Sequence, residues 1–401
     1  MNCSDWKMVK LESCAVFKNG KKIKEDKRKV DGKYKIYGSN GIIGRTDEAL
    51  IENQSIIIGR VGAYCGAIEF SDESVWVTDN AISCVNKENT DIKFLYYLLT
   101  TIPLREMAGG SAQPLINQSI LNNIEIKIPG IEEQKRISDI LYSLDKKIIL
   151  NNEMNKTLEE MAQVLFKRWF VDFEFPNEEG KPYKSSGEEM VDSELGMIPK
   201  NWNYGSLADI SEKIYSGGTP KTSEESYWNG ELSWMSSGET RDNFIIKTDK
   251  KITNIGVQKS STKLSNKYDT VIASAGQGLT RGQTSLLFID TYINQSLICI
   301  KAKKEFAFFN YINLKTRYEE LRAISDSHSI RGSLTTKMIS KMQTIIPTES
   351  TILKFNEIVS PILNNIESNL YQREELIEMR DLLLPKLMNG EIRLDDLKAD
   401  L

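Results

Sequence analysis

Histidine is almost missing from this 401-residue chain, which contains only His328. A Ser-His-Asp triad or a multi-histidine metal site would have to be built on that one residue, so neither is expected. Two phosphate-binding glycine motifs are missing as well, the G-x-x-x-x-G-K-[ST] loop and a G-x-G-x-x-G after a clear strand. Glu125 and Lys127 form a carboxylate–lysine pair of the kind that nucleases use, but no upstream acid stands in a matching context and the pair lies beside a domain junction, so chance explains it better. We therefore expect no catalytic residues and no cofactor site on this chain.

Long apolar runs are also absent. No stretch of eighteen apolar residues occurs, and the opening MNCSDWKMVK has no apolar signal core, so we expect neither a membrane span nor secretion. The five cysteines have no C-x-x-C spacing and are expected to be thiols in a reducing cytoplasm. The length and the 40% hydrophobic content predict two or more globular domains.

Positive charge is in deficit overall, because the net charge is −4, but it is unevenly distributed. Residues 1–45 contain twelve Lys and Arg against five Asp and Glu, and residues 241–281 contain eight against three. Segment 170–200 has the opposite bias, with eight acids against three bases. A single basic stretch is most simply a solvated loop. Two of them, one in each half, indicate binding to phosphate.

Part of the sequence is repeated. The stretch IPGIEEQKRISDIL (residues 128–141) has a fainter counterpart, IPTESTILKFNEIV (residues 346–359). After each junction, apolar residues recur at steps of three, four and seven in a segment without glycine, which predicts a long amphipathic helix. A helix of about 39 residues is roughly 58 Å long at about 1.5 Å per residue. Helices of this length usually pair.

One series in each helix has a seven-residue period and is apolar except at one asparagine. The two series are Ile137, Leu144, Asn151, Leu158 and Leu165, and Phe355, Ile362, Asn369, Leu376 and Leu383. We predict that they form the seam of an antiparallel two-helix coiled coil, with both asparagines near its middle. A polar seam residue costs stability and can fix register, although two solvent-facing asparagines would give the same pattern.

The blocks before the helices also resemble each other, because Trp6 and Trp202 are each followed five residues later by leucine. Short β-rich runs alternate with Gly, Ser and Asn turns, so each block is predicted to be an α+β domain. The predicted fold is two α+β domains joined by two long helices in an antiparallel coiled coil with pseudo-two-fold symmetry. The predicted boundaries are 1–128 (domain 1), 129–172 (helix 1), 173–199 (an acidic linker able to span a long distance), 200–347 (domain 2), 348–390 (helix 2) and 391–401 (tail).

Candidate DNA-binding residues lie among the glycines and basic stretches of both blocks. Lysine neutralises phosphates, whereas Asn and Arg form paired hydrogen bonds with adenine and guanine. In the first block the candidates are Lys18, Lys21, Lys22, Lys24, Lys35, Tyr37, Ser39, Asn40, Arg45, Arg60 and Tyr64. In the second block they are Lys221, Ser236, Ser237, Arg241, Ser274, Gln277 and Arg281. Any single candidate could be an ordinary turn or surface residue, so the prediction of DNA binding depends on the two groups of residues taken together.

Five longer motifs stand out. They are IPGIEEQKRISDIL, GSAQPLINQSIL (110–121), FKRWFVDFEFP (166–176), YSGGTPKTSEESYWNGELSWMSSGE (215–239) and LLPKLMNGEI (383–392). Over nearly its whole length the chain therefore resembles the specificity subunit of type I restriction–modification systems. The second junction departs from the pattern, with Ser350, Thr351 and Ile352 in place of Glu-Glu-Gln, as a diverged repeat would.

The resemblance implies that each domain is a target recognition domain for one half of a bipartite site in double-stranded DNA. It also implies that the helices set the gap and dock two modification (methyltransferase) subunits, giving an adenine methyltransferase in which this cytoplasmic chain is not catalytic. Restriction subunits would add translocation and cleavage. S-adenosylmethionine, ATP and magnesium would bind those partners. Two rival functions are a coiled-coil scaffold for proteins, against which the paired basic stretches argue, and a stand-alone nuclease or methyltransferase, whose motifs are missing.

Overall fold

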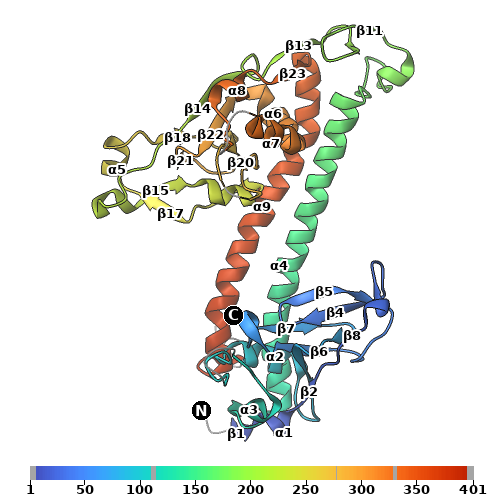
Figure 1. Ribbon diagram of the computed structural model, residues 1–401, viewed down its shortest axis with the longest axis vertical. Coiled ribbons are helices and arrows are strands. Elements are labelled where there is room, and N and C mark those ends of the chain that lie inside the picture. Colours follow the sequence, from blue (N-terminus) through green and yellow to red (C-terminus); the bar gives the residue numbers. More distant parts are fainter. Residues whose placement is uncertain (1–5, 110–113, 277, 328–331, 395–401) are drawn as a thin grey trace. The chain divides into compact units, whose positions relative to one another are not determined.

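Two long helices, α4 (Ile131–Phe166) and α9 (Glu349–Met388), contribute to both parts of the structure (Figure 1). The computed structural model describes residues 6–109, 114–276, 278–327 and 332–394. It divides into unit 1, Met1–Ile149 with Glu374–Leu401, and unit 2, Leu150–Arg373. Each unit therefore contains one α+β domain together with a stretch of both helices, as predicted. Within the described residues, no helix is long and apolar enough to cross a membrane.

The two helices pair in antiparallel fashion. In unit 2, Asn151 of α4 donates to Gln372 of α9 at 2.9 Å, and the rings of Phe166 and Phe355 lie 6.3 Å apart. Residue numbers thus fall along α9 as they rise along α4, which confirms the predicted antiparallel pair. In unit 1, the first turns of α4 likewise share a core with the last turns of α9. The helices begin two residues and one residue after the predicted starts at 129 and 348.

The predicted seam residues lie along this contact. Ile137, Asn151 and Phe355 are buried, and the other seven are partly buried. Asn151 and Asn369 are close together, since the Asn151 Nδ2 atom lies 3.4 Å from the Asn369 carbonyl oxygen. Asn369 in turn donates to Asn155 at 2.9 Å. The side chains of the two asparagines therefore join the helices and do not simply face solvent.

The domain of unit 1 is closed by β1 (Lys7–Lys10), which pairs with β10 (Glu125–Ile128) immediately before α4. One sheet is antiparallel and has the order β2 (Ala15–Asn19), β9 (Ala81–Asn86), β6 (Ser55–Gly59) and β7 (Ile68–Ser71). A second sheet has the order β3 (Arg28–Lys29), β5 (Gly41–Thr46), β4 (Tyr34–Gly38) and β8 (Val75–Val77). The helices are α1 (Leu11–Cys14), α2 (Ile92–Thr100) and α3 (Gln118–Asn122), and α2 packs its apolar face on the first sheet.

The domain of unit 2 repeats this plan. Strand β13 (Asn203–Ser206) pairs with β23 (Gln343–Ile346) before α9. One sheet has the order β14 (Ser211–Ser216), β22 (Leu297–Ala302), β19 (Thr270–Ala273), β20 (Thr284–Leu287) and β16 (Phe244–Ile245). The other has the order β17 (Lys250–Ile252), β15 (Trp228–Met235), β21 (Thr291–Ile293) and β18 (Lys263–Ser265). Its helices are α5 (Asn254–Gln258), α6 (Ala307–Thr316), α7 (Tyr318–Asp326) and α8 (Thr336–Ser340).

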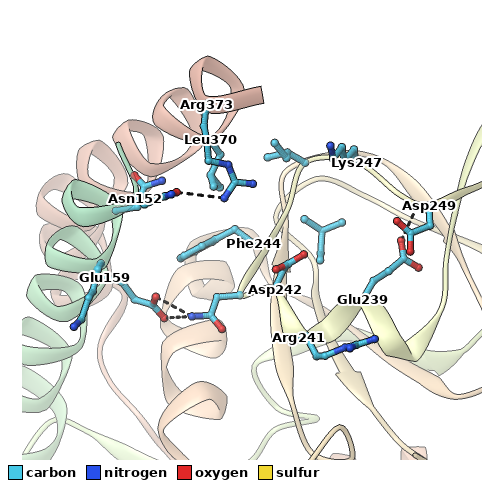
Figure 2. A pocket seen from close by; sticks show the side chains of 15 residues that line it. Asn152, Glu159, Glu239, Arg241, Asp242, Phe244, Lys247, Asp249, Leu370 and Arg373 are labelled. Atoms are coloured by element: carbon cyan, nitrogen blue, oxygen red, sulfur yellow. Dashed lines mark hydrogen bonds between the residues drawn. The ribbon is translucent and has the colours of Figure 1, made fainter. Parts of the chain in front are cut away.

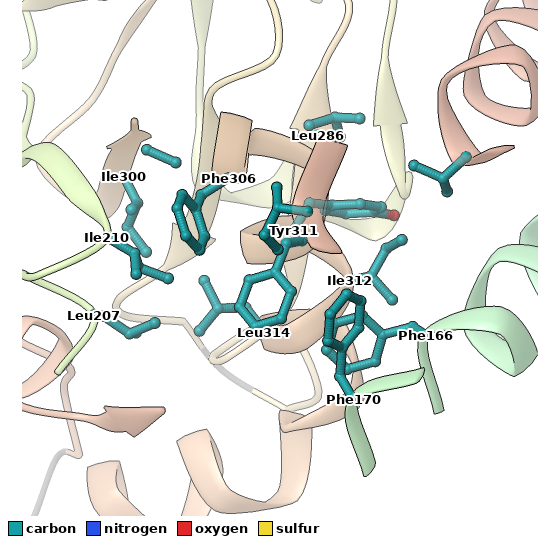
Figure 3. Close-up of a cluster of buried hydrophobic side chains, with 14 of the residues drawn as sticks. Phe166, Phe170, Leu207, Ile210, Leu286, Ile300, Phe306, Tyr311, Ile312 and Leu314 are labelled. Atoms are coloured by element: carbon teal, nitrogen blue, oxygen red, sulfur yellow. The ribbon is translucent and has the colours of Figure 1, made fainter. Parts of the chain in front are cut away.

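The core of unit 2 joins the domain to the long helices. Figure 3 shows Phe166 and Phe170, at the end of α4 and in the π-helical turn after it, pointing toward Ile312 and Tyr311 of α6. The Phe170 ring lies 4.8 Å from the Phe309 ring and 4.9 Å from the Phe355 ring of α9. Aromatic pairs at this spacing add stabilisation beyond their buried area. The motif FKRWFVDFEFP therefore folds as the point where α4 is fixed to its domain.

The predicted linker is wrong in one respect, because segment 173–199 does not span an open distance. Phe175 is buried, with its ring stacked between those of Tyr183 (4.6 Å) and Trp202 (4.8 Å). Two short strands, β11 (Met190–Val191) and β12 (Ile198–Pro199), close a small hairpin beside it. Despite its acidic bias, the segment contains three aromatic residues, Phe173, Phe175 and Tyr183, and their ring contacts hold it against unit 2.

Candidate nucleic-acid interface

In unit 1, the turn between β8 and β9, Thr78–Asn80, connects three of the segments predicted to bind DNA. The Lys21 amide donates to the Val77 carbonyl at 2.9 Å, and the Thr78 amide donates to the Tyr37 carbonyl at 2.9 Å. The Arg60 amide donates to the Asn80 carbonyl at 2.9 Å. The structure thus brings segments 18–24, 37–40 and 60–64 together around one turn, although up to 46 residues separate them in the sequence.

Two glycines allow this close approach. A side-chain carbon at Gly59 would overlap the Tyr64 carbonyl and would lie 2.8 Å from the Ser39 carbonyl oxygen. A side-chain carbon at Gly20 would overlap the Thr78 carbonyl. Only glycine lets the backbone segments meet at these points. The glycine-rich motifs of the first block therefore position backbone and side chains.

The predicted lysines of unit 1 are largely available to solvent. Lys18, Lys21, Lys22 and Lys24 are exposed, and none of them forms an ion pair within the described residues. Lys35 lies 3.6 Å from Glu73. The segment that carries the lysines is itself held in place, since the indole of Trp76 donates to the Lys21 carbonyl at 2.9 Å. Four exposed ammonium groups on an anchored segment suit contact with phosphates.

The other predicted residues of unit 1 differ in exposure. Asn40 and Tyr64 are exposed, and Ser39 is partly buried beside them. Arg45 and Arg60 are held by backbone carbonyls, Arg45 by Gly32 at 2.6 Å and Arg60 by Asp79 at 3.3 Å. Tyr37 is only 5% exposed, and burial raises the pKa of its phenol. The burial of Tyr37 does not support the predicted DNA contact.

Unit 2 contains the counterpart of the Thr78–Asn80 turn between β21 and β22. The Gly218 amide donates to the Ile293 carbonyl at 3.0 Å, and the Asn294 amide donates to the Met235 carbonyl at 3.1 Å. The Ser274 amide donates to the Ser296 carbonyl at 2.9 Å. The same three kinds of segment meet around residues 294–296 as around residues 78–80, which makes Asp79 equivalent to Gln295 and Asn80 equivalent to Ser296.

Several predicted residues of unit 2 have partners inside the domain. Lys221 pairs with Glu224 at 2.9 Å, and Ser236 and Ser237 begin a turn capped by Glu239. Arg241 is exposed, with its Nε atom donating to the Gly238 carbonyl at 3.0 Å. Gln277 lies outside the described residues, as does His328.

Ser274 and Arg281 are buried, so the structure does not support the predicted DNA contact for either of them. The Arg281 guanidinium forms an ion pair with Asp326 and donates to the Gly332 carbonyl at 3.1 Å. Of the basic stretch, Lys267 pairs with Glu367 of α9 at 2.6 Å, and Lys250 lies over the Trp228 ring at 5.7 Å. The Lys and Arg side chains of unit 2 therefore have more ion-pair, hydrogen-bond and aromatic partners within their own unit than the exposed lysines of segment 18–24 have in unit 1.

A cavity of about 350 Å³ in unit 2 is lined by residues of α4 and α9 and by residues of the domain between 239 and 249 (Figure 2). At its base, Asn243 donates to both carboxylate oxygens of Glu159 at 2.8 Å, which ties strand β16 to α4. The lining alternates cations with acids, and burial raises the pKa of the carboxyl of Glu239. A lining with both positive and negative side chains favours the binding of neither an anion nor a cation. Among the described residues, no three His, Cys, Asp or Glu gather as a metal site.

Helix α4 and the π-helical turn after it present an exposed apolar stripe in unit 2. Its exposed members recur at steps of four, seven, three and seven residues and are Leu150, Met154, Met161, Val164 and Val171. A hollow of about 530 Å³ adjoins the last two. This spacing places them on one face, as in a helix that packs against a further partner.

The family model and the curated relatives indicate one family. A family model described as the type I restriction modification DNA specificity domain matches residues 3–160 and 199–379. The MjaIX specificity subunit of Methanocaldococcus jannaschii is 29% identical over 324 residues, covering 78% of this chain and 72% of that protein. The HindI specificity subunit of Haemophilus influenzae is 26% identical over 334 residues, covering 70% and 71%. The type I S subunit from M. genitalium shares the fold, with a TM-score of 0.70 at 18% identity and 97% coverage of both chains.

Proposed function

This chain belongs to the family of type I restriction–modification specificity subunits, and from that premise we propose that it reads a bipartite DNA sequence, one half with each unit. One observation carries the proposal: the arrangement of three segments around Thr78–Asn80 recurs around Asn294–Ser296. Two similar recognition surfaces on one chain suit a target with two separate halves. The lysines of segment 18–24 supply affinity through phosphates without reading sequence.

The long helices have two proposed roles. As an antiparallel pair that enters both units, they set the distance between the two half-sites. The exposed stripe on α4 is proposed to dock a methyltransferase subunit, because an apolar helix face of this length is unfavourable in water and suits a partner helix. Two such subunits would complete an adenine methyltransferase, and restriction subunits would extend it.

The chemistry is proposed to reside on those partners. S-adenosylmethionine, ATP and magnesium would bind there, with this chain contributing sequence recognition and assembly and no catalytic group. The exposed side chains of Lys21, Lys22 and Asn40 in unit 1 suit contact with DNA, which supports the recognition part of this division.

Methylation mapping tests the proposal. The chain is co-expressed with its cognate methyltransferase, and modified adenines are located across a host genome by sequencing. The expected result is one motif with two halves at a constant gap. Exchanging residues 1–128 for the corresponding domain of a relative should change one half only, and exchanging residues 200–347 should change the other. A change in both halves from one exchange, or methylation without a bipartite motif, contradicts the proposal.

A further inference from the structure

We propose that the paired turns themselves read bases, through Asp79 and Asn80 in unit 1 and through Gln295 in unit 2. The inference rests on the proposed function and adds the side chains that determine specificity in each half-site. Asp79 and Asn80 lie at the centre of the segments 18–24, 37–40 and 60–64. Gln295 occupies the position equivalent to Asp79, at the centre of the second surface.

These side chains are exposed on rigid backbone. Asp79, Asn80 and Gln295 are all exposed, whereas the residues on either side of the two turns, Val77 with Ala81 and Ile293 with Leu297, are fully buried. Each turn, together with the strand residue that precedes it, is held by backbone hydrogen bonds to three other segments, at distances from 2.9 to 3.1 Å. A recognition side chain loses less conformational freedom on binding when its backbone is held in this way.

The functional groups suit base edges. Within the described residues, the Asn80 and Asp79 side chains form no hydrogen bond, so the Asn80 amide is available to bond an adenine edge twice. The Gln295 side-chain oxygen accepts from the Thr219 hydroxyl, which leaves its amide N–H groups to donate. A carboxylate such as Asp79 is repelled by phosphates, but it can accept from the N4 amine of cytosine.

The experiment measures methylation on a library of DNA sites randomised at each position of the motif. Asn80→Ala should reduce base preference at one position of one half-site by a factor between about 5 and 150, and Gln295→Ala should do so in the other half. Asp79→Asn should change the preferred base at a position in the same half as Asn80. None of the three should alter the salt dependence of binding, because the lysines that neutralise phosphates are all retained. Asn364→Ala, at an exposed position of α9, is the control and should leave every preference unchanged.

The outcomes separate this inference from the proposed function. If wild-type protein yields a bipartite motif but all three variants retain its base preferences, the turns do not read bases and the inference fails alone. If wild-type protein yields no bipartite motif, the proposed function fails. Melting temperatures within a few degrees of wild type establish that a reduced preference arises at the surface. Reduced preference at several positions in both halves would also overturn the assignment.

Discussion

At the scale of single residues, Lys21, Lys22 and Lys24 are the cations that we expect to contact phosphate. Replacing all three with Ala should weaken binding to every DNA sequence alike. The slope of log affinity against log salt should fall by up to about 0.9 for each phosphate that is no longer neutralised. A titration of DNA binding at several salt concentrations measures this slope. Lys135→Ala is the matched control, because Lys135 lies on α4 and pairs with Glu132 at 3.3 Å. Weaker binding to one sequence only would contradict a phosphate role.

Asp72 leads to a pH prediction. Burial alone would raise the pKa of its carboxyl, but hydrogen bonds from Lys146 (2.7 Å) and Tyr142 (2.5 Å) of α4 lower it overall. A lowered folded-state pKa stabilises the protein above the unfolded-state value of about 3.9, and this stabilisation disappears as pH falls through the folded-state value. Asp72→Asn should therefore lower the free energy of unfolding at pH 7 by less than about 1 kcal/mol, since the side chains of Lys146 and Asp72 are 51% and 36% exposed.

Denaturant unfolding at pH 7, 5 and 3 measures the difference between wild type and Asp72→Asn. The difference should be the same at pH 7 and 5 and should shrink at pH 3. Asp31→Asn, at an exposed position, serves as the control and should show little difference at any pH. A wild-type advantage that grows toward pH 3 would contradict the sign of the shift.

Residue type was predictable from the sequence, but the partner of each side chain was not. The exposure of the lysines in segment 18–24 agrees with the sequence because charge density is a local property, whereas their contact with DNA stays a prediction. The burial of Arg281 was not predictable because its partners, Asp326 and Gly332, lie 45 and 51 residues further along the chain. Asp79 and Gln295, which we propose to read bases, were not among the sequence candidates, because their neighbouring sequences, VTDNAI and YINQSLI, look alike only after the strands that follow them are aligned.

At the scale of elements, the seam asparagines lead to a prediction for the helix pair in unit 2. Asn151 is fully buried and bonded across the seam to Gln372, and Asn369 is bonded to Asn155. Changing both Asn151 and Asn369 to Leu should raise the melting temperature by a few degrees, because a polar seam costs stability. It should also allow alternative registers, because the polar contacts that select one register are gone.

Spin labels at positions 152 and 373, whose side chains lie 3.4 Å apart, measure the register. The double Leu variant should broaden a distance distribution that is single and narrow in wild type. Asn364→Leu on the exposed face of α9 should leave it narrow. An unchanged melting temperature, or a distance distribution as narrow as in wild type, would show that the two asparagines do not select the register of the helix pair.

The helices, their antiparallel pairing and the α+β class of both domains were predictable because periodicity and glycine content are local signals. The hairpin in segment 173–199 was not, because its stability depends on stacking of Phe175 against Trp202, a residue in the next domain. The order of strands in each sheet could not be predicted from the sequence either. In neither domain do apolar and polar residues alternate regularly enough to indicate which strands pair.

At the scale of the whole molecule, each domain is fixed to its own stretch of helix by side-chain hydrogen bonds. In unit 1, the hydroxyl of Tyr97 donates to Asp145 at 2.6 Å, and Arg380 of α9 donates to the same carboxylate at 2.9 Å. In unit 2, Asn243 and Glu159 make the equivalent connection at 2.8 Å. Each set of contacts lies inside one unit. The stretches of α4 and α9 between the two sets can therefore be lengthened without breaking the contacts of either unit.

Seven residues of helical sequence inserted after Ile149 and seven after Arg373, at the two boundaries between the units, should therefore lengthen the spacer alone. The step of seven returns each side chain to the same seam position. At about 1.5 Å per residue it adds about 10 Å, or about three base pairs at about 3.4 Å each. Methylation mapping should then show both half-sites unchanged and the gap longer by about three base pairs. An insertion in α4 only should instead break the seam register and reduce methylation at all sites. An unchanged gap in the matched variant would mean that the helices do not set the spacing.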